Sequence, residues 1–165
     1  MLPKLVHTIV LLVSILLASS QAQNQDLSID LRPYRIVETE DENGDIQEQL
    51  VLADSAEPGE QIVYQLLLRN NSNSPKDSVV AAAPIPVGTH YIANSATHDD
   101  SFLRLEFSLD GETFAPEPLY MVIEDEDGER QVEANPSDYR ALRWLLLRPL
   151  RGEEVLELHY RVTVQ

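Results

Sequence analysis

Strict alternation of apolar and polar residues is the feature that most restricts the fold of this chain. In the segment 156–164 the alternating apolar residues are Leu156, Leu158, Tyr160, Val162 and Val164. The segment 103–109 alternates in the same way, with leucine or phenylalanine at each odd position. A period of two places successive side chains on opposite faces of a strand. Both segments therefore predict half-buried β-strands.

Two further segments predict strands with a larger buried surface. Residues 62–69 have one wholly apolar face, which includes Tyr64, while the other face is mixed. This pattern is typical of a central strand. Residues 141–148 alternate less regularly, but their β-compatible residues place Trp144 on an apolar side. We expect Trp144 to anchor the core.

Turn residues, rather than helix caps, separate these segments. Pairs of the Asx-Gly type tolerate the positive φ that two-residue hairpins require, and three such pairs predict three tight hairpins (Asn43-Gly44, Asp110-Gly111 and Asp127-Gly128). After residue 22, no segment repeats apolar residues at helical spacing over three turns, although residues 136–142 could form one short helical turn. The pattern predicts an all-β fold arranged as an antiparallel β-sandwich.

The first 22 residues predict an export signal. Lys4 precedes the apolar run 9–18, which is about half as long as a membrane-spanning helix requires. The small residues Ser20 and Ala22 fit a cleavage site. We expect residues 1–22 to be a signal peptide that is cleaved after Ala22, so that the mature chain has no membrane span and is periplasmic or extracellular. An uncleaved N-terminal anchor is the alternative.

The chain after the signal divides near residue 57. Residues 23–33 resemble a flexible lead-in. Residues 34–57 are expected to form an N-terminal hairpin that packs on or joins the sandwich, with residues 34–39 paired to residues 46–52 across Asn43-Gly44. The sandwich itself is expected to span residues 58–165.

Composition excludes several classes of partner and chemistry. The chain has 28 acidic and 12 basic residues, a formal net charge of −16, and no cysteine. An acidic chain is a poor ligand for nucleic acid or an anionic membrane, because both bind basic side chains. The absence of cysteine excludes disulfides and thiolate chemistry, so stability must come from packing. Acidic residues gather at 38–48 and 124–129, and we expect a partner to meet them with cations or basic side chains.

Residues 50–165 also carry a series of short motifs. The series comprises Pro58-Gly59-Glu60 before Val63-Tyr64, then Asn70-Asn71-Ser72, the turn 84–88 ending in Gly88, Asp110-Gly111, Leu142-Arg143-Trp144 and Tyr160-Arg161-Val162. Together these motifs resemble the DUF11 family, a conserved repeat domain of bacterial cell-envelope proteins. The resemblance implies an immunoglobulin-like sandwich of Greek-key type with about seven to nine strands. Its structural residues would be Gly59, Gly88, Tyr64, Trp144 and Tyr160. The chain has Ala82-Ala83 where the family usually has an acidic residue, so no metal-binding or cell-wall role is carried over.

Few residues are candidates for catalysis or metal binding. The chain after the signal has His90, His98 and His159 but no Gly-x-Ser-x-Gly motif, so we expect no enzyme, and a hydrolase is the weakest alternative. A transition metal could be bound by His90, His98, Asp99 and Asp100, and a weak calcium site could use Asp125, Asp127 and Glu129. Neither acidic segment has the ligand spacing of an EF-hand, and solvated turns are the alternative for both sets. We expect no bound cofactor.

The sequence therefore predicts a non-catalytic, exported structural or protein-interaction module of the bacterial cell envelope. Its partner would be another envelope or surface protein, which could add a strand to an exposed sheet edge. A periplasmic metal-binding protein that uses His90, His98 and Asp99 or Asp100 is the alternative.

Overall fold

A computed structural model of the chain describes residues 26–125 and 128–165. Within these ranges the protein has ten β-strands and one short 3-10 helix, η1 (Pro136–Asp138), and all strand pairing is antiparallel. The prediction of an all-β antiparallel fold is confirmed. The predicted signal peptide, residues 1–22, lies outside the described residues. None of the helices within the described ranges has the length and apolar character needed to cross a membrane.

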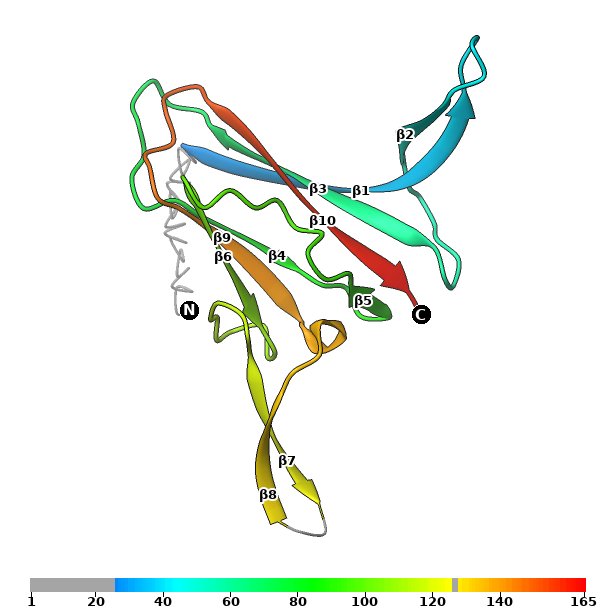
Figure 1. Ribbon diagram of the computed structural model, residues 1–165. Coiled ribbons are helices and arrows are strands. Elements are labelled where there is room, and N and C mark those ends of the chain that lie inside the picture. Colours follow the sequence, from blue (N-terminus) through cyan, green and yellow to red (C-terminus); the bar gives the residue numbers. More distant parts are fainter. Residues whose placement is uncertain (1–25, 126–127) are drawn as a thin grey trace, which may run out of the picture.

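Two sheets face each other in the body of the protein (Figure 1). The first has the order β2-β1-β3-β10-β5 and contains β1 (Leu27–Glu40), β2 (Ile46–Leu52), β3 (Gln61–Asn70), β5 (Thr89–Tyr91) and β10 (Val155–Val164). The second has the order β4-β9-β6 and contains β4 (Val80–Pro84), β6 (Leu103–Ser108) and β9 (Ala141–Leu146). A separate hairpin of β7 (Tyr120–Asp125) and β8 (Gly128–Glu133) projects from the body. The two sheets thus account for eight strands, and the hairpin adds two.

The alternating residues face the core as predicted. Leu158, Tyr160 and Val162 of β10 are fully buried, and β3 is central because β1 and β10 pair with its two edges. Trp144 is fully buried on β9, and its Nε1 donates a hydrogen bond to the carbonyl oxygen of Thr97 at 2.9 Å. Aromatic residues are large contributors to a core when their polar ends find partners. The prediction that Trp144 anchors the core is confirmed.

A short series of rings links the two sheets. The ring of Tyr160 on β10 stacks on Tyr64 of β3, with centroids 5.2 Å apart, and it also contacts Trp144 of the opposite sheet at 6.4 Å. The hydroxyl of Tyr160 donates to the carbonyl oxygen of Pro84 at the end of β4. Burial raises the pKa of Tyr160, which keeps this hydroxyl protonated as a donor. Tyr160 therefore joins the sheets by both packing and a hydrogen bond.

Gly59 and Gly88 lie in turns that contact the end of β10. Their φ values are 90° and 83°, a region that glycine enters at little cost. The amide of Gly59 donates to the carbonyl oxygen of Val164 at 2.9 Å, and the carbonyl oxygen of Gly88 accepts from the amide of Gln165 at 2.8 Å. Both glycines thus form turns that hold the C-terminal strand in place.

The predicted flexible lead-in, residues 23–33, is wrong from Leu27 onward. Residues 27–35 pair with β3 in a continuous register from Leu27 opposite Asn70 to Arg35 opposite Ile62. Pro33 is tolerated in this strand because its backbone nitrogen and carbonyl point away from β3, so no hydrogen bond to β3 is lost. The carbonyl oxygen of Pro33 accepts from the amide of Ala53. Apolar contacts of Leu27 with the core also favour strand structure here.

The predicted N-terminal hairpin is confirmed in its pairing. Residues 34–40 pair with residues 46–52, from Tyr34 opposite Leu52 to Glu40 opposite Ile46, and the hairpin joins the five-stranded sheet as its outer edge. The Asn43-Gly44 turn closes it. The pairing of β7 with β8 ends at Asp125 opposite Gly128, so a hairpin lies at this point, but Gly128 is part of β8 and Asp127 lies outside the described residues. The Asp110-Gly111 pair instead follows β6 and leads to a single bridge between Phe107 and Ala115.

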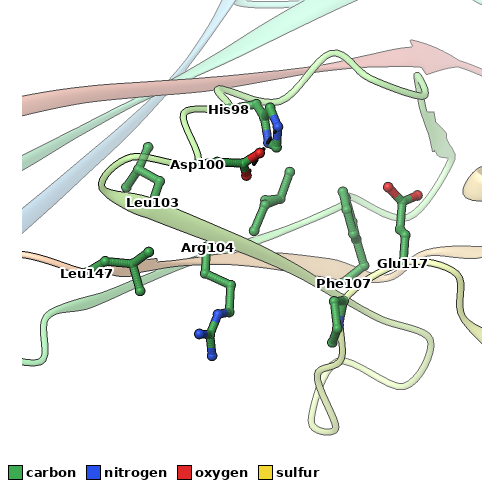
Figure 2. Close-up of a pocket in the computed structure, with 9 residues that line it drawn as sticks. His98, Asp100, Leu103, Arg104, Phe107, Glu117 and Leu147 are labelled. Carbon is green, nitrogen blue, oxygen red and sulfur yellow. Dashed lines mark ion pairs between the residues drawn. The ribbon is translucent and has the colours of Figure 1, made fainter.

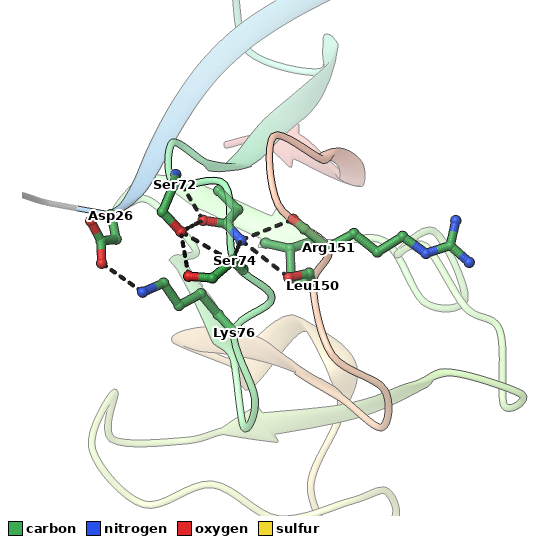
Figure 3. Close-up of polar contacts among 7 residues, drawn as sticks. Asp26, Ser72, Ser74, Lys76, Leu150 and Arg151 are labelled. Carbon is green, nitrogen blue, oxygen red and sulfur yellow. Dashed lines mark hydrogen bonds and ion pairs between the residues drawn. The ribbon is translucent and has the colours of Figure 1, made fainter.

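A buried asparagine fixes the loops at one end of the sandwich (Figure 3). The side chain of Asn70 is fully buried at the end of β3. Its Nδ2 donates to the carbonyl oxygens of Ser74, Leu150 and Arg151, and its Oδ1 accepts from the amide and hydroxyl of Ser72. Because Leu150 is 80 residues away, this one side chain ties together two distant loops.

Two contacts nearby reinforce the same end. Lys76 Nζ lies 2.6 Å from Asp26 Oδ2, an ion pair that holds the residue just before β1. Gly152 lies so close to the loop of Asn73 that a Cβ at position 152 would overlap the Asn73 backbone. This end of the sandwich is therefore closely packed through its backbone as well as its side chains.

We expect Asn70→Ala to lower the free energy of unfolding by about 3 kcal/mol, because the buried carbonyl oxygens and the Ser72 amide would lose their partner. Denaturant unfolding at neutral pH measures the change. Asn71→Ala is the matched control, since Asn71 is exposed and its loss should cost less than about 1 kcal/mol. Equal losses in the two variants would contradict the role assigned to Asn70.

The turn after β6 makes a pH-dependent contribution. The amides of Thr113 and Glu112 and the hydroxyl of Ser108 donate to Asp110 Oδ1, and these hydrogen bonds lower the pKa of Asp110 well below its usual range. A lowered folded-state pKa stabilises the fold above the unfolded value of about 3.9 and loses this effect as the pH falls. We therefore expect Asp110→Asn to be less stable than the wild type at pH 7, with the difference shrinking below about pH 4. Unfolding curves at pH 7 and near pH 2 test this, and a difference that does not change with pH would contradict it.

Candidate functional site

A cleft of about 410 Å³ lies along the outer edge of β6 (Figure 2). Leu103, Leu105 and Phe107 of β6 form its apolar part, and His98, Asp100 and Glu117 come from loops beside it. In Figure 2, His98 and Asp100 lie on one side of β6 and Arg104 on the other, so the cleft extends around the strand edge.

The side chains of His98, Asp100 and Glu117 in this cleft have partners within the chain. His98 Nε2 lies 3.4 Å from Asp100 Oδ1, and both side chains are exposed. Glu117 Oε1 accepts a hydrogen bond from the Tyr139 hydroxyl at 2.8 Å. Burial raises the pKa of Tyr139, and the Glu117 carboxylate raises it further. The tyrosine therefore stays a donor to Glu117.

The geometry does not place an activated nucleophile beside a histidine. Among the described residues, Thr97 Oγ1 is the hydroxyl that lies within hydrogen-bonding distance of an imidazole, 3.0 Å from His159 Nδ1. The same oxygen accepts from the backbone amide of His159 at 2.8 Å. Activation of a hydroxyl requires a base that is itself oriented by a third group. No such group contacts His159 Nε2 in the described parts of the chain, so this pair fixes a loop onto β10 rather than forming a dyad.

His98 and Asp100 lie together, but the other two candidates for a transition metal, His90 and Asp99, have partners of their own. His90 on β5 has Nδ1 3.0 Å from the carbonyl oxygen of Ser137, which requires a proton on Nδ1, and its Nε2 then accepts from the side-chain amide nitrogen Nε2 of Gln165. Asp99 Oδ1 accepts from the amide and hydroxyl of Ser101. These hydrogen bonds lower the pKa of Asp99, as expected of a carboxylate that caps a turn.

No group of three histidine, aspartate or glutamate side chains in residues 26–125 and 128–165 is arranged to hold a metal ion. Of the residues considered for calcium, Asp125 Oδ2 lies 2.6 Å from Arg130 Nε, across the β7–β8 hairpin. Asp127 lies outside the described residues.

A second surface feature is the outer edge of the five-stranded sheet, which is formed by β2. Beyond Arg35, β1 has no further partner in β3, and the β1–β2 hairpin curls away from the body (Figure 1). Every residue of β2 is exposed, including four large apolar ones: Ile46 (71%), Leu52 (51%), Leu50 (48%) and Val51 (46%). A run of exposed apolar residues of this kind is a common mark of an interaction surface.

The backbone of β2 also has unused hydrogen-bonding groups. The bonds from Asp41 to Asp45 and from Ala53 to Pro33 show that odd-numbered residues of β2 face β1. Because the direction alternates along an antiparallel strand, Ile46, Glu48, Leu50 and Leu52 point their amides and carbonyls outward. No hydrogen bond of these backbone groups is found within the part of the chain that the structure describes.

A groove of about 300 Å³ runs beside β2 on the outer face of the sheet. Glu48 and Leu50 of β2 form one wall, and Glu157, His159 and Arg161 of β10 form the other. In its floor, Val63 is buried although it lies on the outer face of β3. The curl of the hairpin thus turns the apolar side chain of Leu50 towards the sheet.

Glutamates occupy the same face of the hairpin. Glu38 of β1 lies directly opposite Glu48 of β2, and Glu40 lies two residues further along β1. Like charges in opposed positions destabilise a strand pair. None of these glutamates is part of an ion pair among the described residues. The face is therefore apolar and negative at once.

The residue pattern predicted the β1–β2 hairpin but not that β2 would lie at a free edge of the sheet. The residues 46–52 alternate weakly, with Ile46, Leu50 and Leu52 on one face, and this was a usable signal for a strand. Which strand lies at the edge of a sheet depends on pairing between distant segments, and alternation does not report it.

Comparisons with known proteins give no relative: no family model, curated protein or solved structure matches the chain. The resemblance to the DUF11 family therefore rests on the motifs alone.

We expect calorimetric titration of the purified protein with zinc, copper(II) or calcium to give no saturable heat. The reason is that His90 and Asp99 use their lone pairs in hydrogen bonds within the chain, so metal binding would have to break them. His98→Ala is the control variant. A saturable heat in the wild type that disappears in His98→Ala would contradict this expectation and support a metal-binding function.

Proposed function

We propose that this chain is a non-catalytic, exported structural or protein-interaction module of the bacterial cell envelope. In this proposal it engages another envelope or surface protein through the free edge of β2. The observation that carries the proposal is the outward row of backbone amides and carbonyls on β2, flanked by exposed apolar side chains.

Three common devices that protect a sheet edge, namely lysine, proline and a bulge, are missing from β2. Natural edge strands carry lysine, proline, a bulge or a covering loop. Residues 46–52 contain neither lysine nor proline, and their register with β1 has no bulge. Strand addition at such an edge is a common mode of protein recognition.

The hairpin as a whole also favours a partner. Beyond Arg35, residues 36–40 pair with β2 alone. A two-stranded ribbon is at best marginally stable in water, and a third strand or a covering surface stabilises it. A partner strand on β2 would supply that support.

Export and family membership belong to the proposal as well. The apolar run 9–18 and the cleavage site after Ala22 support transfer to the periplasm or the cell surface. The motifs shared with the DUF11 family support an immunoglobulin-like form of the sandwich. The lack of an oriented base beside a hydroxyl among the described residues supports a non-catalytic role.

We expect immobilised wild-type protein to recover a specific exported protein from an envelope extract, identified by mass spectrometry. Leu50→Pro should reduce its recovery at least about tenfold, because it removes an outward amide that β1 does not use. Val122→Ala, at an exposed apolar position on β7, is the matched control and should recover the same protein.

Circular dichroism and thermal melting check whether Leu50→Pro remains folded. No protein above background with the wild type, or equal recovery with Leu50→Pro, would overturn the proposed function.

A further inference from the structure

We propose that the β2 edge receives an extended basic segment of the partner as an additional antiparallel strand. This inference rests on the proposed function and names the chemistry of the partner. It follows from three properties of the edge: its backbone groups, its side-chain order and its charge.

The backbone of β2 sets the length of the added strand. Outward amides and carbonyls occur at Ile46, Glu48, Leu50 and Leu52. In an antiparallel ladder, residues opposite such positions exchange two hydrogen bonds each. A seven-residue segment would therefore satisfy all four outward positions of β2.

The side chains of these four residues lie on one face, so they fix the pattern of the partner. Opposed side chains in an antiparallel pair contact each other directly. Read along the added strand, the first and third residues meet Leu52 and Leu50, the fifth meets Glu48, and the seventh meets Ile46. The matching segment is apolar at positions one, three and seven and basic at position five.

Charge selects a basic partner over a second copy of this chain. The hairpin 34–52 has six acidic residues and one basic residue: Glu38, Glu40, Asp41, Glu42, Asp45 and Glu48 against Arg35. The guanidinium of Arg35 donates to the carbonyl oxygen of Ser55. A second copy would bring the same excess of carboxylates to the edge, whereas a lysine or arginine opposite Glu48 would reduce the repulsion between Glu48 and Glu38.

The other edges of the two sheets are obstructed. On β6, the amide and carbonyl of Phe107 pair with Ala115, and the amide of Leu103 donates to Asp99. β5 has only three residues, and β4 ends at Pro84. Within the two sheets, β2 is thus the edge that offers a long uninterrupted ladder.

A labelled peptide tests the pattern directly. The probe is a capped heptapeptide, Val-Thr-Val-Thr-Lys-Thr-Val, and its control has glutamate in place of lysine. Fluorescence anisotropy with the purified protein should show the lysine peptide binding at least about tenfold more tightly than the glutamate peptide. Added salt should reduce this preference, since exposed charges are screened.

Two variants test separately how charge and backbone hydrogen bonds contribute to peptide binding. Glu48→Lys should reverse the preference and favour the glutamate peptide, because it exchanges the sign at the opposed position. Leu50→Pro should abolish binding of both peptides, and Val122→Ala should change neither. Glu48 is exposed, so the reversal can be read even if Leu50→Pro proves unstable.

The outcomes distinguish this inference from the proposed function. The inference of a basic partner segment would be overturned by equal affinity for both peptides, by an unchanged preference in Glu48→Lys, or by no binding of either peptide. The proposed function would still stand if capture of an exported protein depended on Leu50. A dimer in analytical ultracentrifugation that is lost in Leu50→Pro would also overturn the inference of a basic partner segment, because the occupant of the edge would then be a second copy. If the wild-type protein captured no exported protein, or if Leu50→Pro captured it equally well, the proposed function itself would be overturned.

Discussion

The pairing of β3 with β10 is the interaction on which the rest of the structure depends. The two strands are joined from Gln61 opposite Thr163 to Arg69 opposite Val155, and each then pairs with one further strand. Their common inner face supplies Tyr64 and Tyr160, and through Tyr160 it reaches the second sheet. Without cysteine, no covalent link holds the sheets together, so apolar packing on this face has to provide the stability.

The two ends of the sandwich are built differently. At one end, Asn70 and Gly152 hold the loops by short-range contacts that tolerate little change. Away from this end, the β1–β2 hairpin extends beyond β3 and has solvent on its outer edge. In the proposed function, the packed body would fix the position of the β2 edge, and the edge would gain order when the partner binds.

Local pattern predicted much of the fold and little of the candidate site. The strands β3, β6, β9 and β10 could be found because burial follows the two-residue period of a strand, and the pairing of β1 with β2 followed from the turn between them. The start of β1 was not predictable locally, because a proline such as Pro33 is typical of a linker, and only the pairing with the distant strand β3 shows that the strand accommodates it. Likewise, His98, Asp99 and Asp100 are adjacent in sequence, yet Asp99 bonds to Ser101 while His98 lies against Asp100, so the three side chains do not converge on one point. The buried role of Asn70 depends on Leu150 and Arg151, which no local pattern connects to it.

The carboxylates of the hairpin have a second consequence. An open strand edge is a hazard at high local concentration, because copies that meet there can join edge to edge and aggregate. Negative residues beside such an edge act as gatekeepers, since like copies repel one another before their backbones can pair. Glu38, Glu40 and Glu48 would thus hinder edge-to-edge pairing between copies of the chain. They would not repel a cationic strand.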